Sequence, residues 1–264
     1  MRVYIAVDSE GEACITREVG TTGPYGTFQA DYNRRRATDE ATAAVKGARE
    51  AGADDIVVHD CGFIRDATPI GLTLYYDDLP RGIRIAIGGA PMADVAALGF
   101  DGAILIGHHA MAGTPAGVMA HTFSSLTVAS MRLNGKEIGE IGLESLLLGR
   151  FGIPVVLVAG DEAACAEARE WLGDVAVAAV KVGLSTHSAI SLHPQDACEL
   201  IQTLARRAVG GTRRREPLTM QGPFELVVEC SSPEQAEARC VRAGGERVGE
   251  RSYVIHSDEP PLSF

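Results

Sequence analysis

The sequence predicts an α/β fold, with three α/β/α layers around a mostly parallel sheet and a smaller C-terminal α+β domain. Short apolar runs rich in β-branched residues alternate with longer segments of helical periodicity along the first two thirds of the chain. Strands separated by helices favour a parallel sheet that is covered on both faces. The pattern changes near residue 175, which predicts a second, smaller unit.

The first domain is expected to span residues 1–174, and its elements follow from these patterns in order. Its strands are residues 3–7, 56–59, 83–87, 103–106 and 155–158, and the runs 83–87 and 103–106 are expected to be buried. Its helices are residues 31–51, 91–98, 142–151 and 162–172. Asn134-Gly135 joins the apolar run 126–133 to residues 136–138, which is typical of a tight β-hairpin.

The second domain, residues 175–264, is expected to be a small α+β unit. Its predicted elements are a strand at 175–182, a helix at 194–209, a basic linker at 210–216, a strand at 224–229, a helix at 233–243 and a strand at 253–256.

The composition argues against several classes of function. The chain has 264 residues and a net charge of −11, whereas nucleic-acid binding needs a basic surface. No run approaches the roughly 18–20 apolar residues that span a membrane, and no basic region followed by an apolar block marks a signal peptide. Six cysteines without a C-x-x-C pair favour reduced thiols. We therefore expect a cytoplasmic protein with no nucleic-acid or membrane partner.

The most informative residues are two carboxylates, Asp8 and Glu10, directly after the first strand. Alternate residues of a strand point to the same face, so both side chains are expected to converge at the carboxyl end of the strand. Open α/β sheets bind their ligands at this edge. Because two close carboxylates repel each other unless a proton or a metal cation lies between them, the pair predicts a metal site.

Four further residues could contribute to such a site, although each also has an ordinary structural interpretation. His108 and His109 follow the strand 103–106, and because adjacent residues face opposite ways only one of them is expected to face the site, where it could ligate a metal or be a hydrogen-bonded structural histidine. His121 follows a loop rich in glycine and proline, and could act as a general acid or base or be an exposed histidine. Glu140, for which Glu137 and Glu144 are competitors, could simply favour a helix N-terminus, and Asp60 could cap a turn.

Taken together, the motifs resemble a known family. D-x-E-G at the end of the first strand, G-x-H-A after a middle strand, a T-P-x-G-V-M-x-H loop and a G-E-x-G turn are similar to those of the zinc-dependent D-aminopeptidases of the dipeptide-operon (DppA) type. The resemblance covers most of the chain and keeps the order of the motifs. It implies a cytoplasmic peptidase with two neighbouring zinc ions, assembled as a homodecamer that encloses a channel.

The resemblance also implies a role for each site residue. Asp8 falls at the position of the aspartate that bridges the two zinc ions, and Glu10 falls on a ligand of the first ion. His109 and Glu140 fall on ligands of the second ion, and His121 falls on the histidine proposed to be catalytic. Carboxylate oxygen and imidazole nitrogen are ligand types that suit zinc.

One position departs from the family pattern. The family has D-S-H after the second strand, where the histidine ligates the first zinc, but this chain has Asp60-Cys61-Gly62. Glycine offers no side chain, so the first site loses one of its three ligands. Asp60 has the right strand parity but is set back by about 7 Å, at a rise of roughly 3.3 Å per residue. Asp60, Cys61, His59, water or another metal could complete the site, which would hold one or two ions per chain.

The leading hypothesis is metal-dependent hydrolysis of the N-terminal amide bond of a small peptide or an amino-acid amide. The preference for D-residues comes from the resemblance alone. Three alternatives are a single-metal member that acts on a different amide, a non-catalytic metal-binding homologue and a phosphoester hydrolase on the same acidic edge. His121 argues against a pure binding protein, and no glycine loop of the P-loop kind supports a phosphoester substrate.

Overall fold

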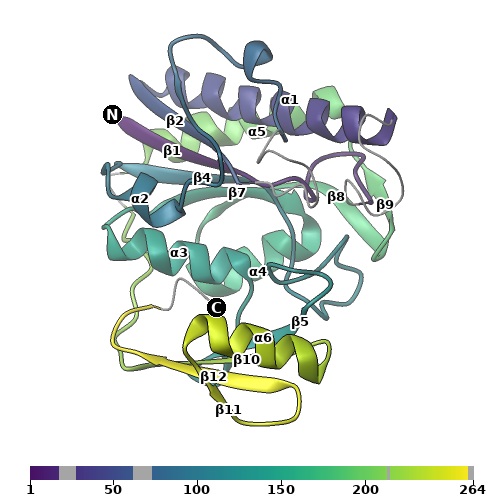
Figure 1. Ribbon diagram of the computed structural model, residues 1–264. Coiled ribbons are helices and arrows are strands. Elements are labelled where there is room, and N and C mark those ends of the chain that lie inside the picture. Colours follow the sequence, from purple (N-terminus) through teal and green to yellow (C-terminus); the bar gives the residue numbers. More distant parts are fainter. Residues whose placement is uncertain (18–27, 62–72, 213–214, 261–264) are drawn as a thin grey trace.

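The computed structural model describes residues 1–17, 28–61, 73–212 and 215–260, and divides them between two β-sheets (Figure 1). The larger sheet has the strand order β3-β2-β1-β4-β7-β8-β9. Adjacent strands in it run parallel, except that β9 runs antiparallel to β8. Its strands are β1 (Arg2–Val7), β2 (Asp55–Asp60), β3 (Arg84–Ala86), β4 (Gly102–His108), β7 (Val155–Asp161), β8 (Ala176–Ser185) and β9 (Ser188–Ser191).

Helices cover both faces of the larger sheet, and this confirms the predicted α/β class. α1 (Phe28–Glu50) and α5 (Pro194–Gly210) pack together on one face, over a buried cluster of alanine, valine and isoleucine side chains. The other face carries α2 (Met92–Ala96), α3 (Glu140–Arg150) and α4 (Glu162–Leu172), while a short 3-10 turn, η1 (Tyr76–Asp78), precedes β3. In the described part of the chain, no helix has the length and apolar character needed to cross a membrane.

The smaller sheet is antiparallel and has the strand order β11-β12-β10-β5-β6. Its elements are β5 (Val128–Leu133), β6 (Lys136–Glu137), β10 (Phe224–Cys230), α6 (Pro233–Ala243), β11 (Glu246–Arg247) and β12 (Ser252–Ser257). Leu143 and Leu146 of α3 and Trp171 of α4 belong to its apolar core. α3 and α4 therefore lie between the two sheets, as Figure 1 shows.

Two expectations about individual strands were wrong. The strand expected at 175–182 does not belong to the smaller unit, because β8 pairs with β7 in the larger sheet. The run 83–87 was expected to be buried, but β3 has only three residues at the edge of the sheet and Ile87 is 53% exposed. An apolar pattern indicates a strand without showing which strands lie beside it. The domain boundary at residue 175 stays a prediction.

The predicted hairpin is confirmed, although it joins the smaller sheet. β5 and β6 pair in antiparallel fashion across Asn134 and Gly135, whose φ angles are +49° and +81°. Both residues therefore adopt the left-handed conformation that a two-residue hairpin turn requires. Through the pairing of β5 with β10, the hairpin brings residues from the middle of the chain into a sheet otherwise built from its C-terminal part.

Glycines let the ends of three neighbouring strands approach one another closely. Gly11 follows β1 and donates its amide hydrogen to the carbonyl of Gly107 at 2.7 Å. A Cβ atom on Gly11 would lie 2.1 Å from the carbonyl oxygen of His108, and a Cβ atom on Gly160 of β7 would also lie 2.1 Å from that oxygen. The end of β4 is thus held between the ends of β1 and β7 with no room for a side chain.

Replacing Gly160 tests this close approach. Gly160→Ala should lower the free energy of unfolding by about 1–3 kcal/mol, because the new methyl group overlaps a backbone oxygen that has little freedom to move. Gly210→Ala is the matched control, since a Cβ atom at the end of α5 meets nothing within 4 Å. The control should be unchanged or more stable by up to about 1 kcal/mol. Urea denaturation measures both variants, and equal stabilities would contradict the packing described here.

Candidate metal centre

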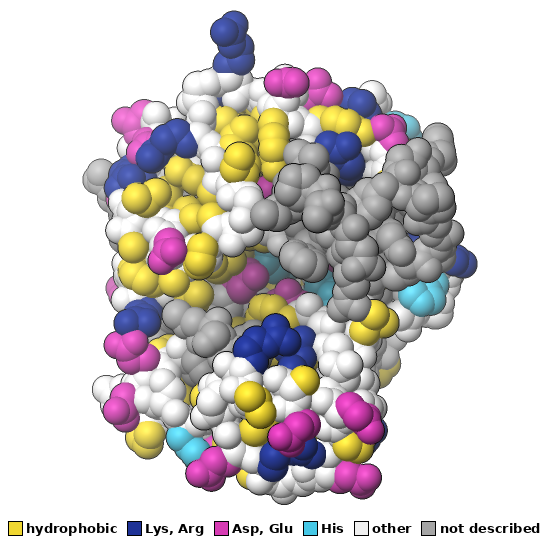
Figure 2. Space-filling view, viewed as in Figure 1, with side chains coloured by type: hydrophobic (Ala, Val, Ile, Leu, Met, Phe, Trp, Pro, Cys, Tyr) yellow, Lys and Arg dark blue, Asp and Glu magenta, His cyan; other side chains and the backbone are white. Residues whose placement is uncertain are grey.

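Four of the predicted site residues come from separate places at the carboxyl edge of the larger sheet. Asp8 follows β1, His109 follows β4, His121 lies in the loop between β4 and β5, and Glu140 is the first residue of α3. Figure 2 shows acidic and histidine side chains at the floor of a hollow between the upper and lower parts of the molecule. The fold therefore brings together residues that lie up to 132 positions apart in the sequence, which is the separation of Asp8 from Glu140.

His109 is buried and presents one unpaired nitrogen to two carboxylates. Its side chain is 1% exposed. Nδ1 lies 3.0 Å from the carbonyl oxygen of Ala110, which can only accept, so Nδ1 carries the proton. Nε2 has no hydrogen-bond partner, and it lies 3.5 Å from Oδ2 of Asp8 and 3.3 Å from Oε1 of Glu140. A buried lone pair directed at two acids is typical of a metal ligand whose orientation is set by its other nitrogen.

His121 repeats this arrangement beside His109. Its Nδ1 donates to the carbonyl oxygen of Met119 at 2.8 Å, and its Nε2 lies 3.9 Å from Oε1 of Glu140. The two imidazole rings are stacked, with centroids 3.9 Å apart and planes 12° from parallel. Both lone pairs are therefore close to the same carboxylate oxygen. His121 is the more accessible of the two histidines, with 14% of its side chain exposed.

The loop that carries His121 is fixed at several backbone positions. The amide of Val118 donates to the side chain of Asp161 at 2.7 Å, and the amide of Met119 donates to the carbonyl of Thr186 at 2.8 Å. Met119 and Phe123, on either side of His121, have φ angles of +52° and +56°. Residues other than glycine seldom adopt positive φ angles, and such angles persist only where the surrounding structure enforces them. The imidazole is therefore held in place by its surroundings and not by a regular helix or strand.

Electrostatics at the cluster favour an added positive charge. Burial raises the pKa of Asp8, and repulsion from Glu10 raises it further. Burial opposes a charge on His109, yet the carboxylates of Glu140 and Asp8 outweigh it and raise the pKa of His109 well above its usual value. For Glu140, burial is offset by His109, His121 and the amide of Phe123, which lower its pKa to about 2. Acids that surround imidazoles in this way form a site for a cation.

Two overlapping groups of side chains in the described residues could each hold a metal ion. One is Asp8, Glu10 and His109, the other is His109, His121 and Glu140, and in each the ligand atoms all lie within 4.8 Å of one another. Ligands bonded at about 2.0–2.1 Å around a tetrahedral zinc ion lie about 3.3 Å apart, close to the two distances measured from Nε2 of His109. The donor types, the spacing and the unpaired buried nitrogen all fit zinc.

Comparison with known proteins decides the family. A family model described as D-aminopeptidase, peptidase M55, matches residues 1–261. The chain belongs to the M55 D-aminopeptidase family. It is 30% identical over 255 residues to the D-aminopeptidase of Bacillus subtilis (strain 168), an alignment that covers 93% of this chain and 87% of that protein.

A solved M55 structure has the same fold as this chain. It is described as the Zn-dependent D-aminopeptidase DppA from Bacillus subtilis, a self-compartmentalizing protease. The TM-score is 0.87 at 26% identity, and the match covers 99% of this chain and 93% of that chain. The family resemblance drawn from the motifs is confirmed.

Asp8 and Glu10 converge as predicted, but strand alternation is not the cause. β1 ends at Val7, and the two acids lie on the turn that follows it. The amide nitrogen of Ser9 lies 3.0 Å from Oδ1 of Asp8 and 3.1 Å from Oε2 of Glu10, so one backbone donor gathers both carboxylates. The hydroxyl of Ser9 donates to the same oxygen of Glu10 at 3.2 Å.

The second-strand residues considered as replacement ligands are engaged elsewhere. Asp60 accepts hydrogen bonds from the amide and hydroxyl of Thr73 and from the hydroxyl of Tyr76. His59 lies with Nδ1 2.6 Å from the hydroxyl of Tyr4. Neither they nor Cys61 belong to the two candidate metal groups found in the described residues. Gly62 lies outside the described residues, and the assignment of Asp60 as a ligand stays a prediction.

Sequence reasoning assigned no role to the buried charged residues behind the cluster. Glu12, Asp161, Glu167 and Lys181 are each at most 5% exposed. Glu167 accepts from the amide of Met111 at 2.7 Å, and its burial raises its pKa to about 7. The available signal was a charge inside or directly after an apolar strand, as with Lys181 in β8. Asp161, Glu167 and Lys181 bond to the backbone of the loops and the turn that carry the candidate ligands.

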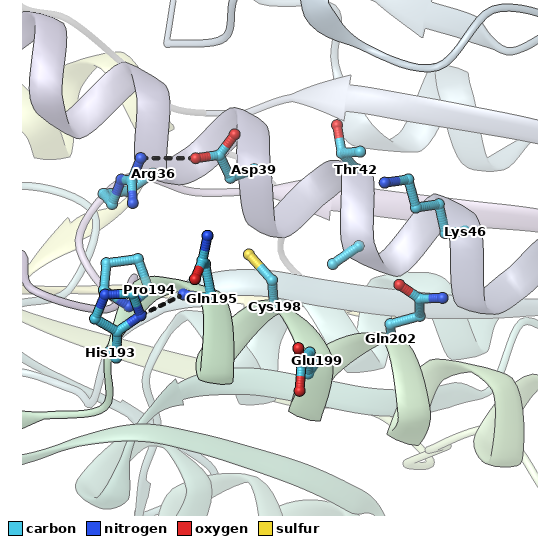
Figure 3. A pocket seen from close by; sticks show the side chains of 11 residues that line it. Arg36, Asp39, Thr42, Lys46, His193, Pro194, Gln195, Cys198, Glu199 and Gln202 are labelled. Carbon is cyan, nitrogen blue, oxygen red and sulfur yellow. Dashed lines mark hydrogen bonds and ion pairs between the residues drawn. The ribbon is translucent and has the colours of Figure 1, made fainter.

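A separate pocket lies on the far side of the sheet, between α1 and α5 (Figure 3). Its volume is about 680 Å³, and its lining includes Lys46, Cys198 and the ion pair of Arg36 with Asp39 at 2.7 Å. None of the predicted site residues lines it. The predicted site residues therefore lie apart from this pocket.

The shared position of His109 gives a direct test of metal binding. His109→Ala should abolish stoichiometric zinc binding, because His109 belongs to both candidate groups. His108→Ala is the matched control, since this neighbouring buried histidine pairs with Glu144 at 2.8 Å and not with the cluster. Elemental analysis of dialysed protein measures zinc per chain, and thermal unfolding confirms that both variants fold. A His109→Ala protein with the zinc content of the wild type would contradict the site.

Proposed function

We propose that this chain is a zinc-dependent aminopeptidase that hydrolyses the N-terminal amide bond of small peptides or amino-acid amides whose first residue has the D configuration. The observation that carries the proposal is the buried Nε2 of His109, unpaired between Asp8 and Glu140. Membership of the M55 D-aminopeptidase family supports the reaction and the stereochemistry. The zinc dependence of the matched Bacillus subtilis structure supports the choice of metal.

Each residue of the cluster has a distinct part in this proposal. Asp8, His109 and Glu140 would hold the metal, and Glu10 would add a fourth ligand or hold a second ion beside Asp8. When bound, zinc polarises the substrate carbonyl and lowers the pKa of bound water to about 7. His121 would deliver a proton from Nε2 to the leaving amine, since its Nδ1–H bond to Met119 keeps that nitrogen directed at the cluster.

The geometry supports at least one ion. Because Nδ1 of His109 is bonded to Ala110, this histidine offers a single ligand atom, and the two candidate groups cannot both use it for different ions. We propose a primary ion on Asp8, His109 and Glu140. A second ion would rely on Glu10 with Asp8 as a bridge, and it would bind more weakly because Gly62 supplies no side chain.

A homo-oligomer is also part of the proposal. The matched structure is of a self-compartmentalizing protease, and this chain covers 93% of it at a TM-score of 0.87. A chain so similar in shape along its whole length can form the same kind of assembly. The homodecamer and the cytoplasmic location stay predictions, and sedimentation of the purified protein measures the first.

Substrate specificity and metal dependence can be tested together. We expect release of ammonia from D-alaninamide and of alanine from D-alanyl-D-alanine, and much slower reaction with L-alaninamide. EDTA should abolish the activity and added zinc should restore it, because zinc supplies the activated water. A protein that binds zinc but hydrolyses none of these amides would favour the non-catalytic alternative. Hydrolysis of p-nitrophenyl phosphate in their place would favour the phosphoester alternative.

The assignment of His121 as the proton donor predicts a separation of activity from metal content. His121→Ala should lower kcat by about 10²- to 10⁴-fold, the usual contribution of a general acid, while zinc per chain stays at the wild-type value. His256→Ala is the control, since this histidine lies on β12 in the smaller sheet. Wild-type kcat in His121→Ala would exclude the role, and loss of its zinc would make His121 a ligand.

A further inference from the structure

The side chain of Lys181 is buried under the turn that carries Glu10. Lys181 lies in β8 and is 2% exposed, and no other lysine or arginine in the described residues is buried to this degree. Its Nζ donates to three backbone carbonyl oxygens, those of Glu10 at 2.6 Å, Glu12 at 2.9 Å and Ile15 at 2.7 Å. An ammonium group has three hydrogens, so each is used by one carbonyl.

These three bonds determine the path of the chain after β1. Residues 8–15 form no helix or strand, and their carbonyls at three positions point inward to one ammonium group. The outer side of the turn is fixed by the bond from Gly11 to Gly107 and by the bond from the amide of Ala13 to Glu40 at 2.8 Å. The carbonyl of Glu10 is thus bonded to β8, which is three strands away from β1 in the sheet order, with β4 and β7 between them.

The same amino group lies near two buried acids. Burial raises the pKa of Glu12 and of Glu40, while the positive charge of Lys181 opposes that rise. Glu12 is 0% exposed, and neither of its carboxylate oxygens has a hydrogen-bond partner. Oε2 of Glu40 is also buried without a partner. Removing the lysine would leave three carbonyls unsatisfied near these two acids, and the turn would have to open to give them water. Such an opening would move Glu10 away from Asp8 and His109.

We propose that Lys181 is a positioning residue for the metal centre, which fixes the backbone of Glu10 and so sets how strongly Glu10, as a fourth ligand beside Asp8, His109 and Glu140, contributes to zinc affinity. The inference rests on the zinc-dependent function proposed above, and it adds a residue outside the candidate ligand set. Lys181 touches neither metal nor substrate in this role. Its effect passes through the carbonyl of Glu10.

The first test compares zinc affinity in two variants of neighbouring residues. Lys181→Met keeps the length of the side chain but donates no hydrogen bonds, and it should weaken zinc binding about 10- to 100-fold, the usual effect of losing a group that orients a ligand. Val180→Ala is the matched control, because Val180 is equally buried but packs in the apolar cluster beneath α1 and α5. The control should lower the melting temperature and leave zinc affinity unchanged. Competition with a chromophoric chelator measures the affinity.

The second test asks whether Lys181 acts through Glu10. In a Glu10→Gln background, Lys181→Met should weaken zinc binding by less than about threefold, because the ligand it positions is already lost. The full 10- to 100-fold effect in that background would overturn the proposal. So would wild-type affinity in Lys181→Met, or an equal loss of affinity in Val180→Ala.

Two controls keep the outcome interpretable. If Lys181→Met does not fold, Lys181→Gln takes its place, since its shorter amide cannot reach all three carbonyls but retains donors that limit the loss of stability. A wild-type protein that binds no zinc would overturn the proposed function and this inference with it. If the wild-type protein binds zinc and is active, and the Lys181 variant binds zinc as tightly as the wild type, only the positioning role would be overturned.

Discussion

The carbonyl oxygen of His108 is held between Gly11 and Gly160, and the rest of the site depends on this contact. A Cβ atom on either glycine would lie 2.1 Å from that oxygen, so the ends of β1, β4 and β7 are as close as backbones can be. The next residue after the contact is His109, whose Nε2 then reaches the acids from the neighbouring strand and from α3. A wider separation of the three strand ends would move the imidazole away from both carboxylates.

Around this contact the molecule concentrates charge that it excludes from the rest of its core. Most buried strand residues are apolar, and acids and histidines gather where β1 and β4 end. The cost of burying them is offset by backbone donors and by opposite charges, as with Glu140, which accepts from the amide of Phe123 and faces two imidazoles. Within the cluster, Nε2 of His109 is buried without a hydrogen-bond partner. A buried polar atom without a partner is costly unless a ligand completes it.

The sequence allowed the strands, the helices and most of the cluster to be predicted, because those signals are local. A run such as residues 103–106 indicates a strand by itself, and a histidine directly after it must lie at the edge of the sheet. The placement of β8 and of the β5–β6 hairpin could not be predicted, since apolar alternation does not encode the neighbouring strand. The role of Lys181 could not be predicted for the same reason. Its partners lie more than 160 positions away, and only the folded chain shows that three carbonyls meet its ammonium group.

The ammonium group of Lys181 also affects how the acidic edge responds to its surroundings. Carbonyl oxygens that converge beside carboxylates form the environment in which proteins bind potassium or sodium ions, and such ions exchange with the solvent. A cation that is covalently attached to a strand cannot be exchanged, diluted or replaced by another ion. Mobile salt screens exposed charges over roughly 8–10 Å at physiological concentrations but has little access to a buried group. This turn is therefore held by a cation that belongs to the chain itself and that the solution cannot exchange.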